Sequence, residues 1–140
     1  MDPHDSPLHE LAQLYGLETA YHDATGVLRQ SPSPAILAVL RALAAPLTTI
    51  EDAVAALRQR RQALWQRVVE PVAVAWGAQG TELVVRVPAQ QAAVRCATHL
   101  ALETGEVRSD AVRLHDLPVV DSTEVEGVRY VAKCVSLPAG

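Results

Sequence analysis

Aromatic residues are scarce in this chain of 140 residues, which has two Trp, three Tyr and no Phe. Carbohydrate-binding surfaces stack aromatic faces on sugar rings, so few side chains qualify for such a surface. Tyr21 and Tyr130 are the candidate glycan contacts. Trp65 and Trp76 follow apolar patterns that favour the interior, and we expect them to form a structural junction between a helical front half and a β back half.

An excess of charge of one sign is also lacking. Residues 1–70 carry six basic and eight acidic groups, residues 71–140 carry the same numbers, and the net charge is -4. This balance argues against nucleic acid and an anionic membrane as main partners. No apolar run approaches the roughly 20 residues that span a bilayer, and the N-terminus MDPHDSPLHE lacks the pattern of a signal peptide. The sequence therefore predicts a cytoplasmic protein.

The motifs of common catalytic sites are missing as well. The chain has no Gly-rich phosphate loop, no Gly-x-Ser-x-Gly elbow, no His-Glu-x-x-His and no Cys-x-x-Cys. Its five histidines lack metal-ligand spacing. Cys96 and Cys134 are expected to be buried thiols rather than a disulfide. The sequence predicts no catalytic residue, no cofactor-binding residue, no metal ligand and no cofactor.

Residues that typically begin and end a helix lie near the start of the chain. Ser6 followed by Pro7 predicts the beginning of a helix, and Gly16 predicts its end. Asp23 and Gly26 then bracket a turn, which indicates a small hairpin or an ordered loop.

A second helix is predicted at AILAVLRALAA, with Ser33 as its N-cap and Pro34 at its first position. Its only charge is Arg41, so we expect it to be buried on nearly all sides.

A third helix is predicted from Thr48, which would form a capping box with Glu51. Its apolar positions follow steps of three and four residues, and they are Ile50, Ala53, Val54, Leu57, Leu64, Trp65 and Val68. Arg58, Arg60 and Arg61 allow two interpretations, a phosphate-binding patch or a solvated helix face. The solvated face is favoured because the rest of the chain is not basic.

The apolar period changes to two at VVEPVAVAWG, residues 68–77, which predicts a strand. Four further strands are predicted at 81–88, 94–103, 106–114 and 128–137, and residues 116–127 are expected to be mostly connection. Five or six strands are fewer than the about seven of an immunoglobulin-type sandwich. The sequence predicts an α+β fold, in which a three-helix subdomain (1–68) packs on an antiparallel immunoglobulin-like β-sandwich (69–140).

Several phrases, in order, resemble the N-terminal, non-catalytic region of bacterial 4-alpha-glucanotransferases of the amylomaltase (MalQ) type. These phrases are LHELAQLYGLETAYHDATG, SPSPAILAVLRALAAPL, ALRQRRQALWQRVVEPVAVAW and EVEGVRYVAKCVSLP. They cover nearly the whole chain. Ala44 and Ala45 stand where a Gly is common in that family.

The resemblance implies helices and a β-sandwich placed ahead of a catalytic (β/α)8 barrel. Such enzymes transfer α-1,4-glucan segments between maltooligosaccharides through a glycosyl-aspartate intermediate, and all of the catalytic residues lie in the barrel. This chain alone is therefore not expected to be an enzyme, and its expected role is to pack on the barrel. It would end before the barrel, and a sandwich without its last strand would expose an edge that can pair two copies.

The resemblance leaves two other functions open. One is a module that binds α-glucan, and the other is a stand-alone adaptor for protein partners. We expect the catalytic barrel, α-glucan and a second copy of the chain as partners, and neither nucleic acid nor membrane.

Overall fold

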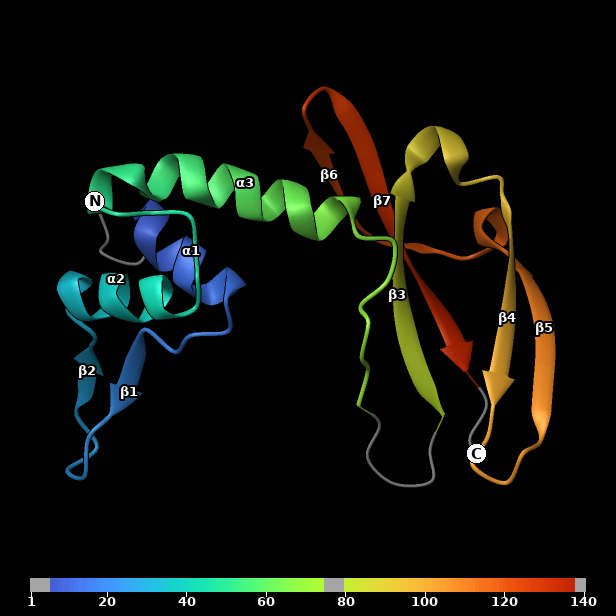
Figure 1. Cartoon of the computed structure of the whole chain (residues 1–140), viewed down its shortest axis with the longest axis horizontal. Helices are drawn as coiled ribbons and strands as arrows, with labels where there is room; N and C mark the ends of the chain where they lie inside the picture. Colours follow the sequence, from blue (N-terminus) through green and yellow to red (C-terminus); the bar gives the residue numbers. More distant parts are fainter. Residues whose placement is uncertain (1–5, 75–79, 138–140) are drawn as a thin grey trace. The chain divides into compact units, whose positions relative to one another are not determined.

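The computed structural model describes residues 6–74 and 80–137 (Figure 1). The chain divides into two compact units, Met1–Ala63 and Leu64–Gly140. The described residues form three α-helices and antiparallel sheets, which confirms the predicted α+β class. No helix in the described ranges is long and apolar enough to cross a membrane.

Helix α1 (Pro7–Leu14) begins and ends where the sequence predicts. The Ser6 side chain accepts a hydrogen bond from the backbone N–H of His9 at 3.4 Å. Gly16 follows the helix with φ 74°, a left-handed conformation that costs glycine little. Side-chain capping and a glycine stop thus fix both ends locally.

A hairpin follows, formed by β1 (Ala20–His22) and β2 (Leu28–Gln30). The Asp23 carboxylate accepts hydrogen bonds from the backbone N–H groups of Thr25 and Val27, at 2.9 and 3.0 Å, and from Arg29 Nε at 2.9 Å. Hydrogen bonds from the Thr25 hydroxyl, from Arg29 and from the Val27 N–H lower the pKa of Asp23 to about 2. One ionised side chain therefore organises the whole turn.

Helix α2 (Ser33–Ala42) differs from its prediction at its start. Its N-cap is Pro32, not Ser33, and no side chain caps it. Ser33 is the first helical residue, because the Pro32 carbonyl already accepts the N–H groups of Ala35 and Ile36, at 2.9 and 3.2 Å.

Helix α2 was expected to be buried on nearly all sides, and this prediction is wrong. Only Ile36 and Leu40 are buried, while Val39 is 43% and Leu43 is 46% exposed. Ile36 and Leu40 are one turn apart, so the helix buries a single narrow stripe.

Helix α3 (Ala53–Gln66) follows a 3-10 turn, η2 (Ile50–Asp52). The capping box joins Thr49 with Asp52, one residue later than the predicted pair of Thr48 and Glu51. The buried residues of α3 are Ala53, Ala56 and Leu57. The predicted apolar face is therefore wrong at Ile50 and Val54, which are 43% and 65% exposed, and at Val68, which is 54% exposed and lies beyond the end of α3.

One buried cluster forms the core of the first unit. Its members come from α1, from α2 and the residues after it, and from the first turns of α3, and they are Leu8, Leu11, Ala12, Ile36, Leu40, Ala45, Leu47, Ala53, Ala56 and Leu57. Several of these positions are alanine, which lets the helix backbones approach closely.

The second unit contains two antiparallel sheets. In the first, β7 (Val128–Leu137) lies between β3 (Thr81–Pro88) and β6 (Val119–Val125). The second is a hairpin of β4 (Arg95–Ala101) and β5 (Val107–Arg113). The strands predicted near β3, β4, β5 and β7 are confirmed.

Two predictions about strands are wrong. Residues 116–127 were expected to be mostly connection, but they contain β6 and its turn to β7. Residues 68–74 were expected in a strand, yet they form none, and Val72 and Val74 are 75% and 68% exposed. Pro71 has no N–H to donate, and the segment makes one backbone bond to β3, from Arg86 N to Val68 O at 2.7 Å. Residues 75–77, with Trp76, lie outside the described residues.

A second buried cluster joins the two sheets. Val85, Val87, Val131 and Val135 come from the three-stranded sheet, and Leu114 comes from η4 (Leu114–Asp116), the 3-10 turn between β5 and β6. Partly buried Cys96 and Val112 add the hairpin's inner face. Both cysteines are free thiols of intermediate exposure.

Candidate functional site

A cleft of about 220 Å³ lies in the second unit, between the β4–β5 hairpin and the end of β7. We call it the hairpin cleft. Its polar lining residues are Thr98, Arg108, Ser109, Asp110 and Ser136, and its apolar ones are Leu100, Val112, Val135 and Leu137. It is thus an apolar floor with polar groups at its rim.

The register of the hairpin explains which side chains share the cleft. Cys96 pairs with Val112, Thr98 with Asp110, and Leu100 with Arg108. Alternate residues of a strand share a face, so these three pairs lie on one side of the hairpin. The first pair packs on the buried cluster, and the next two open into the cleft.

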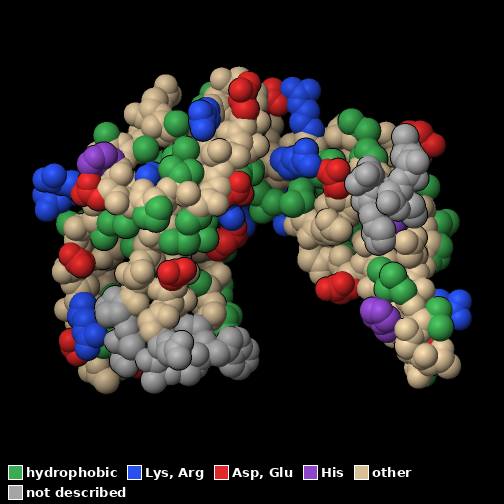
Figure 2. Space-filling view, turned by 180° about the vertical axis from the view of Figure 1, so that it is seen from behind, with side chains coloured by type: hydrophobic (Ala, Val, Ile, Leu, Met, Phe, Trp, Pro, Cys, Tyr) green, Lys and Arg blue, Asp and Glu red, His purple; other side chains and the backbone are tan. Residues whose placement is uncertain are grey.

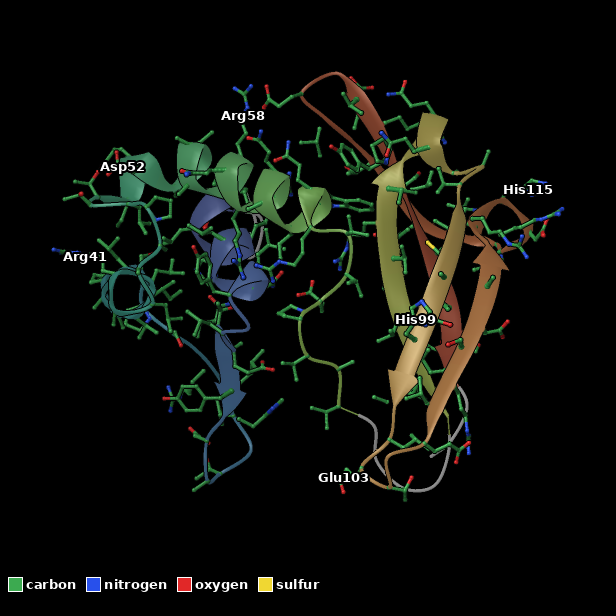
Figure 3. The ribbon with its side chains drawn as sticks, turned by 45° about the vertical axis from the view of Figure 1, so that its right-hand side comes forward. Arg41, Asp52, Arg58, His99, Glu103 and His115 are labelled. Atoms are coloured by element: carbon green, nitrogen blue, oxygen red, sulfur yellow. The ribbon has the colours of Figure 1, made fainter. Side chains whose placement is uncertain are left out.

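The opposite face of the hairpin carries a different set of groups. His99 pairs with Ser109, and His99 Nδ1 lies 2.9 Å from Ser109 Oγ. Figure 3 marks His99 on β4 and Glu103 at the turn that follows. Because side chains alternate between the two faces of a strand, the hairpin side chains that face the cleft are those of the even-numbered positions. On β7 the same alternation turns Val135 toward the hairpin and Ser136 to the opposite face.

The other wall of the cleft exists because β6 is shorter than β7. Pairing between β6 and β7 ends at Val119 and Lys133, whereas β3 pairs with β7 as far as Leu137. Within the described residues, no strand therefore follows β6 along the last residues of β7, which run on beside the hairpin (Figure 1). Val135 is 3% exposed there, and Ser136 is exposed.

The charges at the rim are partly neutralised. Arg108 Nε donates to Glu106 Oε1 at 2.7 Å. This contact lowers the pKa of Glu106 and raises that of Arg108, so both stay ionised around neutral pH. Asp110 accepts the backbone N–H of Ala111 through Oδ1 at 2.7 Å. The local sum of these three groups is one negative charge, which does not favour an anionic ligand.

A larger hollow in the first unit is a weaker candidate. It measures about 450 Å³, but it is lined by Gln13 and by residues 16–20 alone. These residues come from one short stretch of the chain, so the hollow is a depression on the surface of a loop and is not enclosed by several elements. The hairpin cleft draws on three strands.

The predicted glycan contacts belong to different units. Tyr21 lies on β1, opposite Arg29, and is 57% exposed. Tyr130 lies on the central strand β7, opposite Pro88 and Thr123, and is half-buried. Tyr21 keeps the accessible ring that stacking on a sugar requires, and Tyr130 does so only in part.

The expected junction at Trp65 contains a network of charges. The Arg86 guanidinium carbon lies 6.0 Å from the centre of the Trp65 ring, at the limit of a cation–π contact. Glu70 accepts from Arg67 Nη1 and from Arg86 Nη1, each at 2.9 Å, and these two hydrogen bonds lower the pKa of Glu70. The network ties the end of α3 to β3. The second residue of the junction, Trp76, lies outside the described residues.

Two arginines of α3, Arg60 and Arg61, have partners within the first unit. Arg60 donates to the Leu14 carbonyl at 3.3 and 3.2 Å, and its guanidinium lies 4.2 Å from the Tyr15 ring centre. Arg61 forms an ion pair with Glu10 at 2.5 Å. Arg60 thus satisfies a carbonyl that the end of α1 leaves open. On the face drawn in Figure 2, basic and acidic side chains are interspersed.

Sequence reasoning missed Lys133. It is the one lysine beside eleven arginines, it is 4% exposed, and its Nζ donates to the Leu117 carbonyl. The signal was the residue type: a lysine on a strand between apolar neighbours, in a chain that otherwise uses arginine for positive charge. Lys133 ties the connection after η4 to β7.

Within the described ranges, no group of three or more His, Cys, Asp or Glu residues could hold a metal ion. The acidic residues before the last strand are spread over η4, β6 and the turn after it. His115 Nδ1 lies 2.7 Å from Asp116 Oδ1 at the surface.

Comparisons with known proteins bear on the fold. A search of solved structures found the crystal structure of amylomaltase from Corynebacterium glutamicum, at a TM-score of 0.63 and 24% sequence identity. The match covers 95% of this chain and 19% of that chain. The likeness shows the fold. No protein-family model matches the sequence, and no curated protein matches it either.

The chain thus spans about a fifth of the amylomaltase chain it matches, 19% by length. In the described structure, Asp110 is the one acidic residue that lines the hairpin cleft. Retaining glycoside chemistry needs two carboxyl groups about 5 Å apart, and the lining of this cleft does not hold such a pair.

Proposed function

We propose that this chain is a non-catalytic domain of a 4-alpha-glucanotransferase that transfers α-1,4-glucan segments between maltooligosaccharides. Its role is structural, and it packs on the enzyme's (β/α)8 barrel. The observation that carries the proposal is the likeness of fold, which covers 95% of this chain and 19% of an amylomaltase. The resemblance of several phrases, in order, to the N-terminal region of that family supports it.

The fold of the second unit is part of this proposal. We infer that its five described strands belong to an immunoglobulin-like β-sandwich and that the three helices of the first unit form a subdomain that packs on it. The shared cluster between the two sheets supports a sandwich. The strand count is lower than the about seven of an immunoglobulin domain.

The test is enzymatic and uses the complete gene product. The coding DNA on both sides of residues 1–140 is read, and the complete protein is incubated with maltotriose. We expect a barrel-type domain in the same frame, and release of glucose together with longer maltooligosaccharides. A complete protein without a barrel, or one that leaves maltotriose unchanged, would refute the proposal.

Binding of α-glucan by the domain itself is the second candidate. The exposure of Tyr21, 57%, on a hairpin whose turn is fixed by Asp23 favours it. Retarded migration of the chain in a gel that contains amylose, lost in Tyr21→Ala, is the expected result. Equal migration with and without amylose would refute glucan binding, and the structural role would be the one that remains.

A further inference from the structure

The hairpin cleft is lined by three strands, and we propose that it binds the end of an α-1,4-glucan chain. The inference rests on the proposed function for the choice of sugar. It assigns glucan binding to Thr98, Arg108 and Asp110, away from the tyrosines that the sequence suggested.

The size of the cleft limits the ligand. Its volume is about 220 Å³, below the about 300–1,000 Å³ of pockets for drug-sized ligands. A long glucan cannot lie inside it, whereas a terminal ring with part of the next one can. The rest of such a chain would extend into solvent.

The chemistry of the rim fits a neutral ligand that is rich in hydroxyl groups. Asp110 uses Oδ1 for the Ala111 N–H, which leaves Oδ2 to accept hydrogen bonds from sugar hydroxyls. The Thr98 hydroxyl donates to the Asp110 carbonyl at 3.4 Å, so its oxygen can accept from a sugar hydroxyl, and Arg108 supplies N–H donors. Adjacent hydroxyls of a glucose ring need such a mixture of donors and acceptors.

The charge of the cleft argues against phosphates and carboxylates. Arg108 is the one cation that lines the cleft in the described structure, and it is already paired with Glu106 at 2.7 Å. Asp110 adds a negative charge beside it. An anionic ligand would meet a net negative rim, whereas a neutral sugar would not.

The floor of the cleft provides the apolar contact. Leu100, Val112 and Val135 line it, and Val135 is 3% exposed as part of the buried cluster. The C–H faces of a pyranose ring are apolar, so they can cover these side chains while the hydroxyls reach the rim. The floor is part of the core, which keeps it rigid.

The experiment is a titration of the 140-residue chain with maltotriose, followed by backbone amide chemical shifts. We expect shifts at Thr98, Arg108 and Asp110. Asp110→Asn replaces a charged acceptor by a neutral one, so the dissociation constant should rise about tenfold. Thr98→Phe should fill the cleft and abolish the shifts.

Asp121→Asn is the matched control. Asp121 also lies on a strand of the second unit, and its Oδ1 also accepts the N–H of the next residue, Ser122, at 2.7 Å. It should bind maltotriose like the original chain. Circular dichroism of each variant separates loss of binding from loss of folding.

Two outcomes would overturn the inference. One is an absence of shifts up to about 50 mM maltotriose, which excludes affinities in the millimolar range. The other is a set of shifts outside the cleft, for example at Tyr21, that Asp110→Asn does not change. Transfer activity of the complete protein is a separate measurement, so failure of the proposed function and failure of the cleft can be told apart.

Discussion

Leu114→Ala should destabilise the second unit and leave the first unit unchanged. Leu114 is 1% exposed and is one of the three largest fully buried side chains of the described chain. It packs in the cluster of Val85, Val87, Val131 and Val135. The first unit has a separate cluster with no member in common.

The magnitude follows from the cavity that the substitution leaves. Leu→Ala in a core costs about 2–5 kcal/mol, through lost transfer free energy and an unfilled cavity. Leu114 lies in a short 3-10 turn between two strands, which can move inward and fill part of the space, so we expect about 3 kcal/mol. With a slope of about 1.5 kcal/mol per molar urea, the unfolding midpoint should fall by about 2 M.

The assay uses two signals that report on different units. Both tryptophans, Trp65 and Trp76, belong to the second unit by their place in the sequence, so tryptophan fluorescence follows its unfolding. Helices α1 and α2 belong to the first unit, so far-ultraviolet circular dichroism follows mainly that one. Leu11→Ala, at a residue that is 0% exposed in α1, should lower the dichroism midpoint instead.

Val120→Ala is the control, because Val120 is a strand residue that is 52% exposed. It should change the free energy of unfolding, followed by fluorescence, by less than about 0.5 kcal/mol. The reasoning is refuted if Leu114→Ala has as small an effect as Val120→Ala. It is also refuted if both signals move together in Leu114→Ala, because the two clusters would then unfold as one.

Three further substitutions test local features. Ala44 has φ 58°, so Ala44→Gly should raise the stability of the first unit by up to about 1 kcal/mol in urea, whereas Ala38→Gly inside α2 should lower it by about 1 kcal/mol. The pKa of Asp23 falls from 3.8 to about 2 on folding, so its stabilisation of the hairpin is present above pH 3.8 and is lost as the pH falls toward 2. The protection of the Val27 amide against hydrogen exchange should fall over the same pH range. In Asp23→Asn this pH dependence should disappear. Lys133→Met leaves the Leu117 carbonyl without its donor and should cost about 1–3 kcal/mol by tryptophan fluorescence, and no change would mean that the contact is dispensable.

Local signals predicted the elements whose ends are fixed by nearby residues. Ser6 and Gly16 bound α1 through contacts within one turn of the helix. The alternation of Leu83, Val85 and Val87 predicted the buried face of β3, and Val85 and Val87 are buried there, 8% and 9% exposed. In these cases the backbone conformation depends on neighbours along the chain, so the pattern suffices.

The turn before β7 offered a signal that was overlooked. Glu126 and Gly127 have φ 50° and 76°, the left-handed pair of a two-residue hairpin turn. A glycine between two runs that alternate in polarity indicates such a turn. Reading it would have predicted β6, a strand that is exposed at most of its positions.

Alternation was misleading for residues 68–74, because pairing decides whether an alternating segment becomes a strand. The apolar composition of α2 likewise does not say which of its faces finds a neighbour. The hairpin cleft could not be predicted at all. It depends on where the pairing of β6 with β7 stops and on the register of β4 with β5, and both are contacts between segments far apart in the sequence.

The homodimer that the sequence suggested through an exposed strand edge stays a prediction, and β6 sets a condition on it. Among the described strands, β6 lies at one edge of its sheet and carries Asp121 and Glu124. In a two-fold antiparallel pair centred on Asp121 or on Glu124, that carboxylate would lie opposite the same carboxylate of the other copy, and like charges that face each other destabilise a strand pair.

Charged edge residues commonly prevent such pairing. Light scattering should therefore find the original chain monomeric if β6 is the edge concerned, and the double variant Asp121→Thr with Glu124→Thr should associate. An original chain that dimerises through β6 at low salt would show that the two carboxylates do not guard the edge. Equal monomeric behaviour of both chains would show that the edge is closed by something other than charge.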